Sequence, residues 1–179
     1  MTRGIAEEPA EEVDVNRAKA LAIVSMAMML GCHQARQGDV VLNHQEIEDA
    51  ISGLRDAYAA FNRGDINAAV RILDPDVEWI EPPEFPGGGT YHGVEGAKQY
   101  LAQSRASAAQ VISEPEQFIP AGNRIIVFVH ARVLPKGSNT WQDVWLADLY
   151  TFQNGRATSM RAFAHRDDAL HWTGVTTSR

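Results

Sequence analysis

Apolar residues recur at steps of three and four positions between residues 45 and 62. The residues that share this spacing are Ile47, Ile51, Leu54, Tyr58 and Phe61. Such spacing places side chains on one face of a helix, so it predicts an amphipathic helix. Gly64 suits the left-handed position that ends a helix, and Asp65 can cap a second helix over residues 66–73.

β-Branched and aromatic residues dominate the second half of the chain. They predict a short strand over residues 77–81 and, after a helix over residues 93–108, strands over residues 117–120, 124–134, 140–152 and 157–164. Asn154-Gly155 between the last two is typical of a hairpin turn. This order predicts an α+β fold with three helices on one face of an antiparallel sheet.

Residues 82–89, with the sequence PPEFPGGG, interrupt this regular pattern. Prolines lack a backbone donor and glycines leave the backbone loose, so neither a helix nor a strand can continue through them. Irregular segments of this kind often surround binding sites. We therefore expect residues 82–89 to form the rim of a pocket.

Residues 1–43 are predicted to be an extension that precedes a domain over residues 44–175. Residues 1–12 are acidic without apolar periodicity, which predicts disorder, and residues 14–31 favour a helix. The apolar stretch before Cys32 is open to three interpretations: a short signal peptide, a helix packed on the domain or a partner, or a tail added by an upstream start codon. Acidic residues precede the basic ones, which argues against a signal and favours a cytoplasmic protein.

The composition of the chain argues against several classes of function. The formal net charge is −7 and Lys and Arg form no run, which argues against nucleic acid as a partner. No stretch approaches the ~20 apolar residues of a membrane span. Cys32 is the single cysteine, and no Cys/His spacing typical of zinc or motif typical of a nucleotide cofactor is present, so we expect neither metal nor cofactor.

Four segments carry a resemblance to a known family. They are residues 57–65 (AYAAFNRGD), 74–79 (DPDVEW), 89–96 (GTYHGVEG) and 150–156 (YTFQNGR). In this order they resemble the SnoaL-like polyketide cyclase and ketosteroid isomerase group of the nuclear transport factor two-like superfamily. The resemblance implies a cone-shaped, curved antiparallel sheet wrapped around three helices (cystatin-like), a hydrophobic cavity, and a homodimer formed through the outer face of the sheet.

The resemblance also implies two catalytic carboxylates. Glu81 precedes Pro82 as the family's base precedes a proline, and Asp148 lies four residues before Phe152 as the family's neutral acid precedes an aromatic. The family's tyrosine position is occupied by Ala57, with Tyr58 one residue, or about 100° of helix, away. This mismatch leaves the oxyanion site open and argues against steroid isomerisation.

The residues themselves single out Asp148. Strand alternation places it on one face with Val144, Leu146, Tyr150 and Phe152, so a cavity on that face would raise its pKa and suit it to proton transfer. The alternative is an outward-facing carboxylate paired with an arginine. Glu81 could equally be a loop carboxylate in solvent, and His130 either a cavity base or a core or interface histidine.

We expect the pocket to take a hydrophobic small molecule. The predicted catalytic residues are Asp148, Glu81 and His130, and the predicted substrate-binding residues are Tyr58, Trp79, Phe128, Leu146, Tyr150 and Met160. The predicted function is a cofactor-independent isomerase, cyclase or dehydratase acting on a carbonyl compound. Two alternatives stay open: a non-catalytic binding or dimerisation module, and an epoxide hydrolase-like enzyme, although Leu146 stands where that enzyme's pattern needs an arginine.

Overall fold

The computed structural model describes residues 41–176, so the predictions for the acidic leader, the helix over 14–31 and Cys32 lie outside the described residues. The elements run in the order α2 (His44–Asn62), α3 (Ile66–Ala69), β1 (Leu73–Glu81), β2 (Gly89–His92), α4 (Gly93–Ser107), β3 (Gln110–Ala121), β4 (Arg124–Leu134), β5 (Gln142–Gln153), β6 (Arg156–Phe163) and α5 (Arg166–Thr173). The described part is therefore α+β, as predicted.

Local sequence explains where the first helices begin. Asn43 and Glu46 form a capping box, in which each side chain bonds the other's backbone N–H, and this fixes the start of α2. Asp65 accepts from the backbone N–H of Ala68 at 3.0 Å and caps α3, as its position in the sequence predicts.

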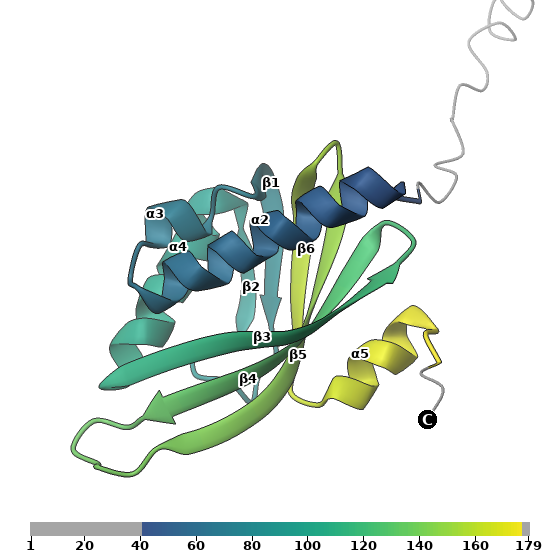
Figure 1. The fold of residues 1–179 in the computed structure, drawn as a ribbon. Helices are drawn as coiled ribbons and strands as arrows, with labels where there is room; N and C mark the ends of the chain where they lie inside the picture. The colour runs from purple at the N-terminus through teal and green to yellow at the C-terminus, as the bar shows by residue number, and fades with distance from the viewer. Residues whose placement is uncertain (1–40, 177–179) are drawn as a thin grey trace, which may run out of the picture. The chain divides into compact units, whose positions relative to one another are not determined.

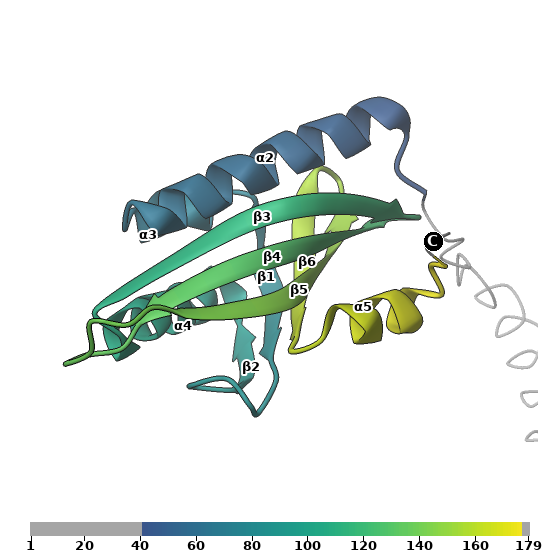
Figure 2. The ribbon, with the colours of Figure 1, turned by 60° about the horizontal axis from the view of Figure 1, so that its bottom comes forward.

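The six strands form one curved, open sheet in the order β2-β1-β6-β5-β4-β3 (Figures 1 and 2). The long strands β3, β4, β5 and β6 are neighbours in antiparallel pairs, as predicted. One pair differs from the prediction, because β1 lies parallel to β6. A parallel neighbour is possible here because β1 and β6 are far apart in the sequence and need no hairpin between them.

Helices cover both faces of the sheet, which corrects the predicted one-sided arrangement. Leu54 of α2 and Ala97 of α4 belong to the main core together with Val127 of β4. On the opposite face, α5 buries Ala169 against Ile126 and Leu149. We call the face that carries α2 and α4 the inner face and the face that carries α5 the outer face.

In the part of the chain that the structure describes, no helix is long and apolar enough to cross a membrane.

Candidate functional site

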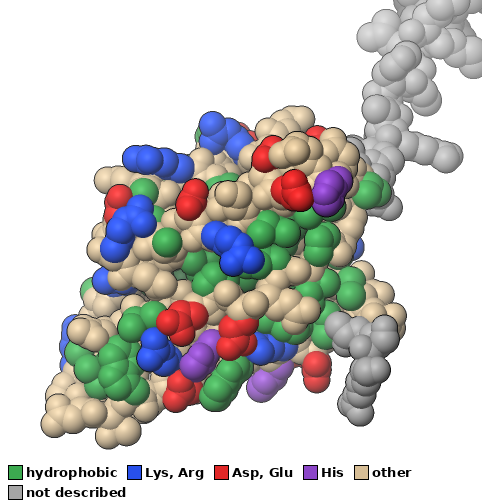
Figure 3. All heavy atoms as spheres, viewed as in Figure 1, with side chains coloured by type: hydrophobic (Ala, Val, Ile, Leu, Met, Phe, Trp, Pro, Cys, Tyr) green, Lys and Arg blue, Asp and Glu red, His purple; other side chains and the backbone are tan. Residues whose placement is uncertain are grey.

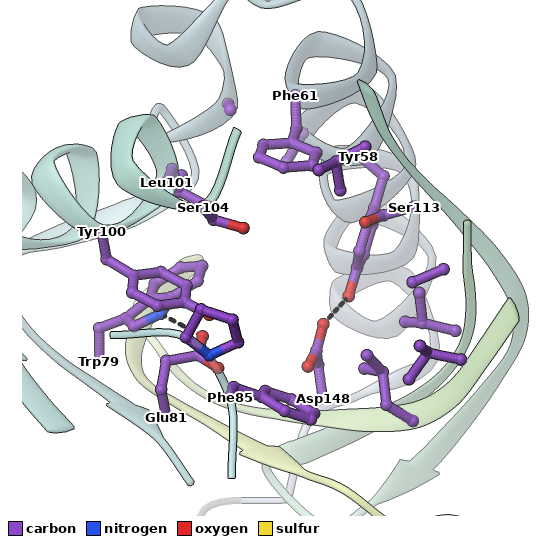
Figure 4. Close-up of a pocket in the computed structure, with 18 of the residues that line it drawn as sticks. Tyr58, Phe61, Trp79, Glu81, Phe85, Tyr100, Leu101, Ser104, Ser113 and Asp148 are labelled. Carbon is purple, nitrogen blue, oxygen red and sulfur yellow. Dashed lines mark hydrogen bonds between the residues drawn. The ribbon is translucent and has the colours of Figure 1, made fainter. Parts of the chain in front are cut away.

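A cavity of about 220 Å³ lies between the inner face of the sheet and the helices α2 and α4. Its lining is mostly apolar and aromatic, and the polar groups that face it are few (Figure 4). Phe85 and Pro86 of the irregular segment border the cavity, which confirms the expected rim. The backbone packs so closely here that position 88 requires glycine, because a Cβ on Gly88 would lie only 2.3 Å from the Pro82 carbonyl oxygen.

Asp148 lies in the middle of β5 and points into this cavity (Figure 4). Val144, Leu146 and Tyr150 line the same cavity, so the predicted strand alternation is confirmed. The Tyr58 hydroxyl donates a hydrogen bond to Asp148 Oδ2 at 2.5 Å. Tyr58 reaches Asp148 from the facing helix α2, although it lies one residue after Ala57, which occupies the family's tyrosine position.

Burial governs the charge of Asp148. Its side chain is half-buried, and the surface that stays free borders the cavity. Desolvation raises the pKa of Asp148 to about 6, and the hydrogen bond from Tyr58 acts in the opposite direction because it favours the charged form. At neutral pH the Asp148 carboxyl is therefore mostly ionised.

Glu81 is the last residue of β1 and lines the same cavity, with only 6% of its surface exposed. This excludes the alternative of a carboxylate in solvent. The indole N–H of Trp79 donates to Glu81 Oε1 at 2.7 Å (Figure 4). Desolvation, and then the negative charge of Asp148, raise the pKa of Glu81 to about 8, so this carboxyl is mostly protonated at neutral pH.

The cavity therefore holds two carboxyl groups in different protonation states. Like charges near each other disfavour double ionisation, and here the bond from Tyr58 favours the charge on Asp148. An ionised carboxylate can accept a proton and a neutral carboxyl can donate one. The pair can thus supply a base and an acid to one ligand at neutral pH.

His130 does not face the cavity, which corrects its predicted orientation. Val129 and Ala131 line the cavity, so His130 between them lies on the outer face. Its ring stacks on Trp145 at 4.9 Å between centroids, and its Nε2 lies 2.6 Å from Asp143 Oδ1. The third predicted catalytic residue is thus separated from the other two by the sheet.

The predicted substrate-binding residues divide into two groups. Tyr58, Trp79, Leu146 and Tyr150 line the cavity. Phe128 lies on the outer face below the guanidinium of Arg166, and Met160 is buried in the core beside Trp79 without reaching the cavity. The prediction for these last two is therefore corrected.

Several cavity residues escaped the sequence reasoning. Three that carry a hydroxyl group are Tyr100 and Ser104 of α4 and Ser113 of β3. α4 follows an irregular segment and its apolar pattern is weak, so the sequence did not show which of its faces would meet the sheet. Ser113 lies in the part of β3 that precedes the predicted strand.

The outer face carries ion pairs and exposed aromatic rings. Figure 3 shows acidic, basic, histidine and hydrophobic side chains close together on the surface of the molecule. Arg132 pairs with Glu114 and Arg166 with Glu116, while Trp145 is 52% exposed. The homodimer expected through this face stays a prediction. Among the described residues, no cluster of His, Cys, Asp and Glu side chains could hold a metal ion.

Solved structures share this fold. The chain matches TerC co-crystallised with polyporic acid, with 27% identity, a TM-score of 0.59, and coverage of 70% of this chain and 97% of TerC. It also matches an NTF2-like protein of unknown function from Burkholderia pseudomallei, with 25% identity, a TM-score of 0.60 and the same coverages. A protein of ketosteroid isomerase-like fold from Catenulispora acidiphila is 19% identical at a TM-score of 0.57, over 69% of this chain and 93% of that one.

A search of the curated proteins finds no match. The family model described as the SnoaL-like domain matches residues 54–160, which include Tyr58, Glu81 and Asp148. This match covers more than half of the 179 residues and agrees with the sheet and helices described above. The chain belongs to the SnoaL-like domain family.

Proposed function

We propose that the protein is a cofactor-independent enzyme that moves a proton on a hydrophobic carbonyl compound, as an isomerase, cyclase or dehydratase does. The observation that carries the proposal is the pair Asp148 and Glu81 in one aromatic cavity, the first held ionised by Tyr58 and the second kept neutral by burial. Raised carboxyl pKa values of this kind suit proton transfer near neutral pH.

In this proposal Asp148 acts as the base. It removes a proton from the carbon beside the carbonyl, and the electron pair of that C–H bond moves toward the carbonyl oxygen. Glu81 donates a proton or a hydrogen bond to that oxygen. Because the Trp79 N–H donates a hydrogen bond to Glu81 Oε1, the proton of Glu81 lies on Oε2. Asp148 then returns its proton to carbon, and as the carbonyl re-forms Glu81 takes back any proton that it gave to the oxygen. These roles reverse those implied by the family resemblance.

Two comparisons support a small-molecule ligand. The SnoaL-like family match places the cavity residues within the matched segment, and TerC, at 27% identity, was crystallised with polyporic acid. The epoxide hydrolase-like alternative loses support, because no arginine is among the residues that line the described cavity. The non-catalytic binding module stays as the competing function.

Deuterium exchange tests the proposal without a known substrate. Apolar cyclic ketones incubated with the protein in D₂O should gain deuterium beside the carbonyl faster than in buffer alone. Asp148→Asn and Glu81→Gln should each slow this exchange by about 100-fold or more, because each removes one proton-transfer group. Mass spectrometry of the recovered ketone measures the exchange.

Matched controls lie on the same strands outside the cavity. Glu78→Gln on β1 and Asp143→Asn on β5 change exposed carboxylates and should leave the exchange rate unchanged. Full exchange in both cavity variants would remove the proton-transfer assignment. Ketones that bind in native mass spectrometry but never exchange would favour the binding module.

A further inference from the structure

The charges that face the cavity are all of one sign. Glu81 and Asp148 line it, and the lining residues include no Lys, Arg or His within the part of the chain described here. Arg105 lies near one end, but its guanidinium donates to the Phe61 carbonyl oxygen at 2.7 Å and is not part of the lining. Negative charge in the cavity therefore has no cationic partner among the described lining residues.

The walls around these carboxyls are aromatic. The rings that line the cavity are Tyr58, Phe61, Trp79, Phe85, Tyr100 and Tyr150. Trp79 forms a corner, with its ring 6.1 Å from that of Tyr100 and 6.5 Å from that of Tyr150, the latter nearly perpendicular at 80°. The faces of such rings carry partial negative charge and attract cations.

We propose that this cavity also binds a molecule with a positively charged nitrogen, which lies between the two carboxyls and the aromatic corner around Trp79. The inference rests on the cavity being the ligand site of the proposed function, and it adds a second class of ligand. A cation that ionises Glu81 leaves no neutral acid for a carbonyl compound, so the two ligands exclude each other. Figure 4 shows Trp79, Tyr100, Glu81 and Asp148 at the same end of the cavity, with Phe61, Leu101 and Ser104 toward the other. A cationic head with an apolar body matches this division.

Every titratable group that faces the proposed position is acidic or phenolic. They are Tyr58 from α2, Glu81 from β1, Tyr100 from α4, and Asp148 and Tyr150 from β5. β3 and β4 contribute only uncharged residues, among them Ser113, Val129 and Ala131. A bound cation would thus meet no repulsive partner from any element around the cavity.

The same arrangement links cation binding to proton release. In the empty cavity burial raises the pKa of Glu81 to about 8, so most molecules hold a proton there at pH 7. A cation near Glu81 favours its charged form and lowers that pKa. Binding of a cation at pH 7 should therefore release protons, whereas binding of a neutral molecule of the same shape should not.

Choline and 3,3-dimethylbutan-1-ol make the matched test, because they share shape and differ in the charged nitrogen. Titration calorimetry of the full chain should show choline binding about tenfold or more tighter than the alcohol. Repeating the titration in buffers of different ionisation enthalpy should show proton release with choline alone. Asp148→Asn and Glu81→Gln should each weaken the binding of choline about tenfold and leave the affinity for the alcohol unchanged. The control Glu78→Gln should change neither affinity.

Failure of this inference differs from failure of the proposed enzyme. No choline binding, or alcohol binding as tight as choline, would overturn the cationic ligand even if neutral ketones exchange deuterium. Choline binding with proton release, in a protein that exchanges no ketone, would support the cationic ligand and contradict the proposed proton transfer.

Discussion

At the scale of single residues, the hydrogen bond from Tyr58 sets the charge of Asp148. The bond favours the ionised carboxylate, while desolvation favours the neutral form. Tyr58→Phe removes the donor and should raise the pKa of Asp148. Exchange that needs ionised Asp148 should slow by about tenfold at pH 7, with the rising limb of its pH profile moved to higher pH.

The pH profile of deuterium exchange, measured for wild type and Tyr58→Phe, checks this prediction. Tyr91→Phe is the matched control, because that hydroxyl donates to the Gly87 carbonyl oxygen and lies outside the cavity lining. A Tyr58→Phe profile that overlays the wild type would show that the 2.5 Å bond does not control Asp148.

Residue-level prediction from sequence succeeded where a polar residue interrupts an apolar strand. Asp148 is such a residue: the alternation of β5 put it on one face with Val144, Leu146 and Tyr150, and this face lines the cavity. The same reasoning failed for His130 and Phe128, because α5 covers part of the outer face and β4 is apolar on both faces. When both faces of a strand are apolar, the alternation of residues does not show which face lines the cavity.

At the scale of elements, the sequence predicted β4 at its observed bounds and β5 within about two residues, because both are long apolar runs bounded by turns. It missed β2, a four-residue strand beside the glycines, and the first part of β3, where Glu114, Pro115 and Glu116 weaken the pattern. It also missed α5, whose polar start resembled a surface segment. Tertiary contacts, which a single sequence does not show, stabilise these elements.

Arg166 provides such contacts for α5. Its guanidinium donates to Glu116 Oε2 at 2.6 Å and to the Val129 carbonyl oxygen at 3.0 Å, and it lies over the Phe128 ring. Arg166→Ala should lower the free energy of unfolding by about 1–3 kcal/mol, because it removes the donor to the part-buried Val129 carbonyl oxygen and breaks the ion pair with Glu116. Denaturant unfolding measures the loss; Lys136→Ala, in an exposed turn, is the control. Equal stability of the two variants would contradict this role.

At the scale of the whole molecule, the cavity carboxyls make folding depend on pH. The pKa of Glu81 rises from 4.5 to about 8 on folding, so the folded state holds a proton that the unfolded chain has lost. The stabilisation from this proton is complete below about pH 4.5 and disappears as the pH rises through about 8. Asp148 acts in the same direction between its ordinary value and about 6.

The wild type should therefore lose stability between about pH 5 and about pH 9, by on the order of 3 kcal/mol more than Glu81→Gln. Glutamine keeps an acceptor for the Trp79 N–H but has no proton to lose, so the variant isolates the Glu81 contribution. Unfolding in denaturant at several pH values measures both curves. Parallel curves would mean that Glu81 titrates alike in the folded and unfolded chains, and the neutral acid that the proposed mechanism needs at position 81 would then be lost.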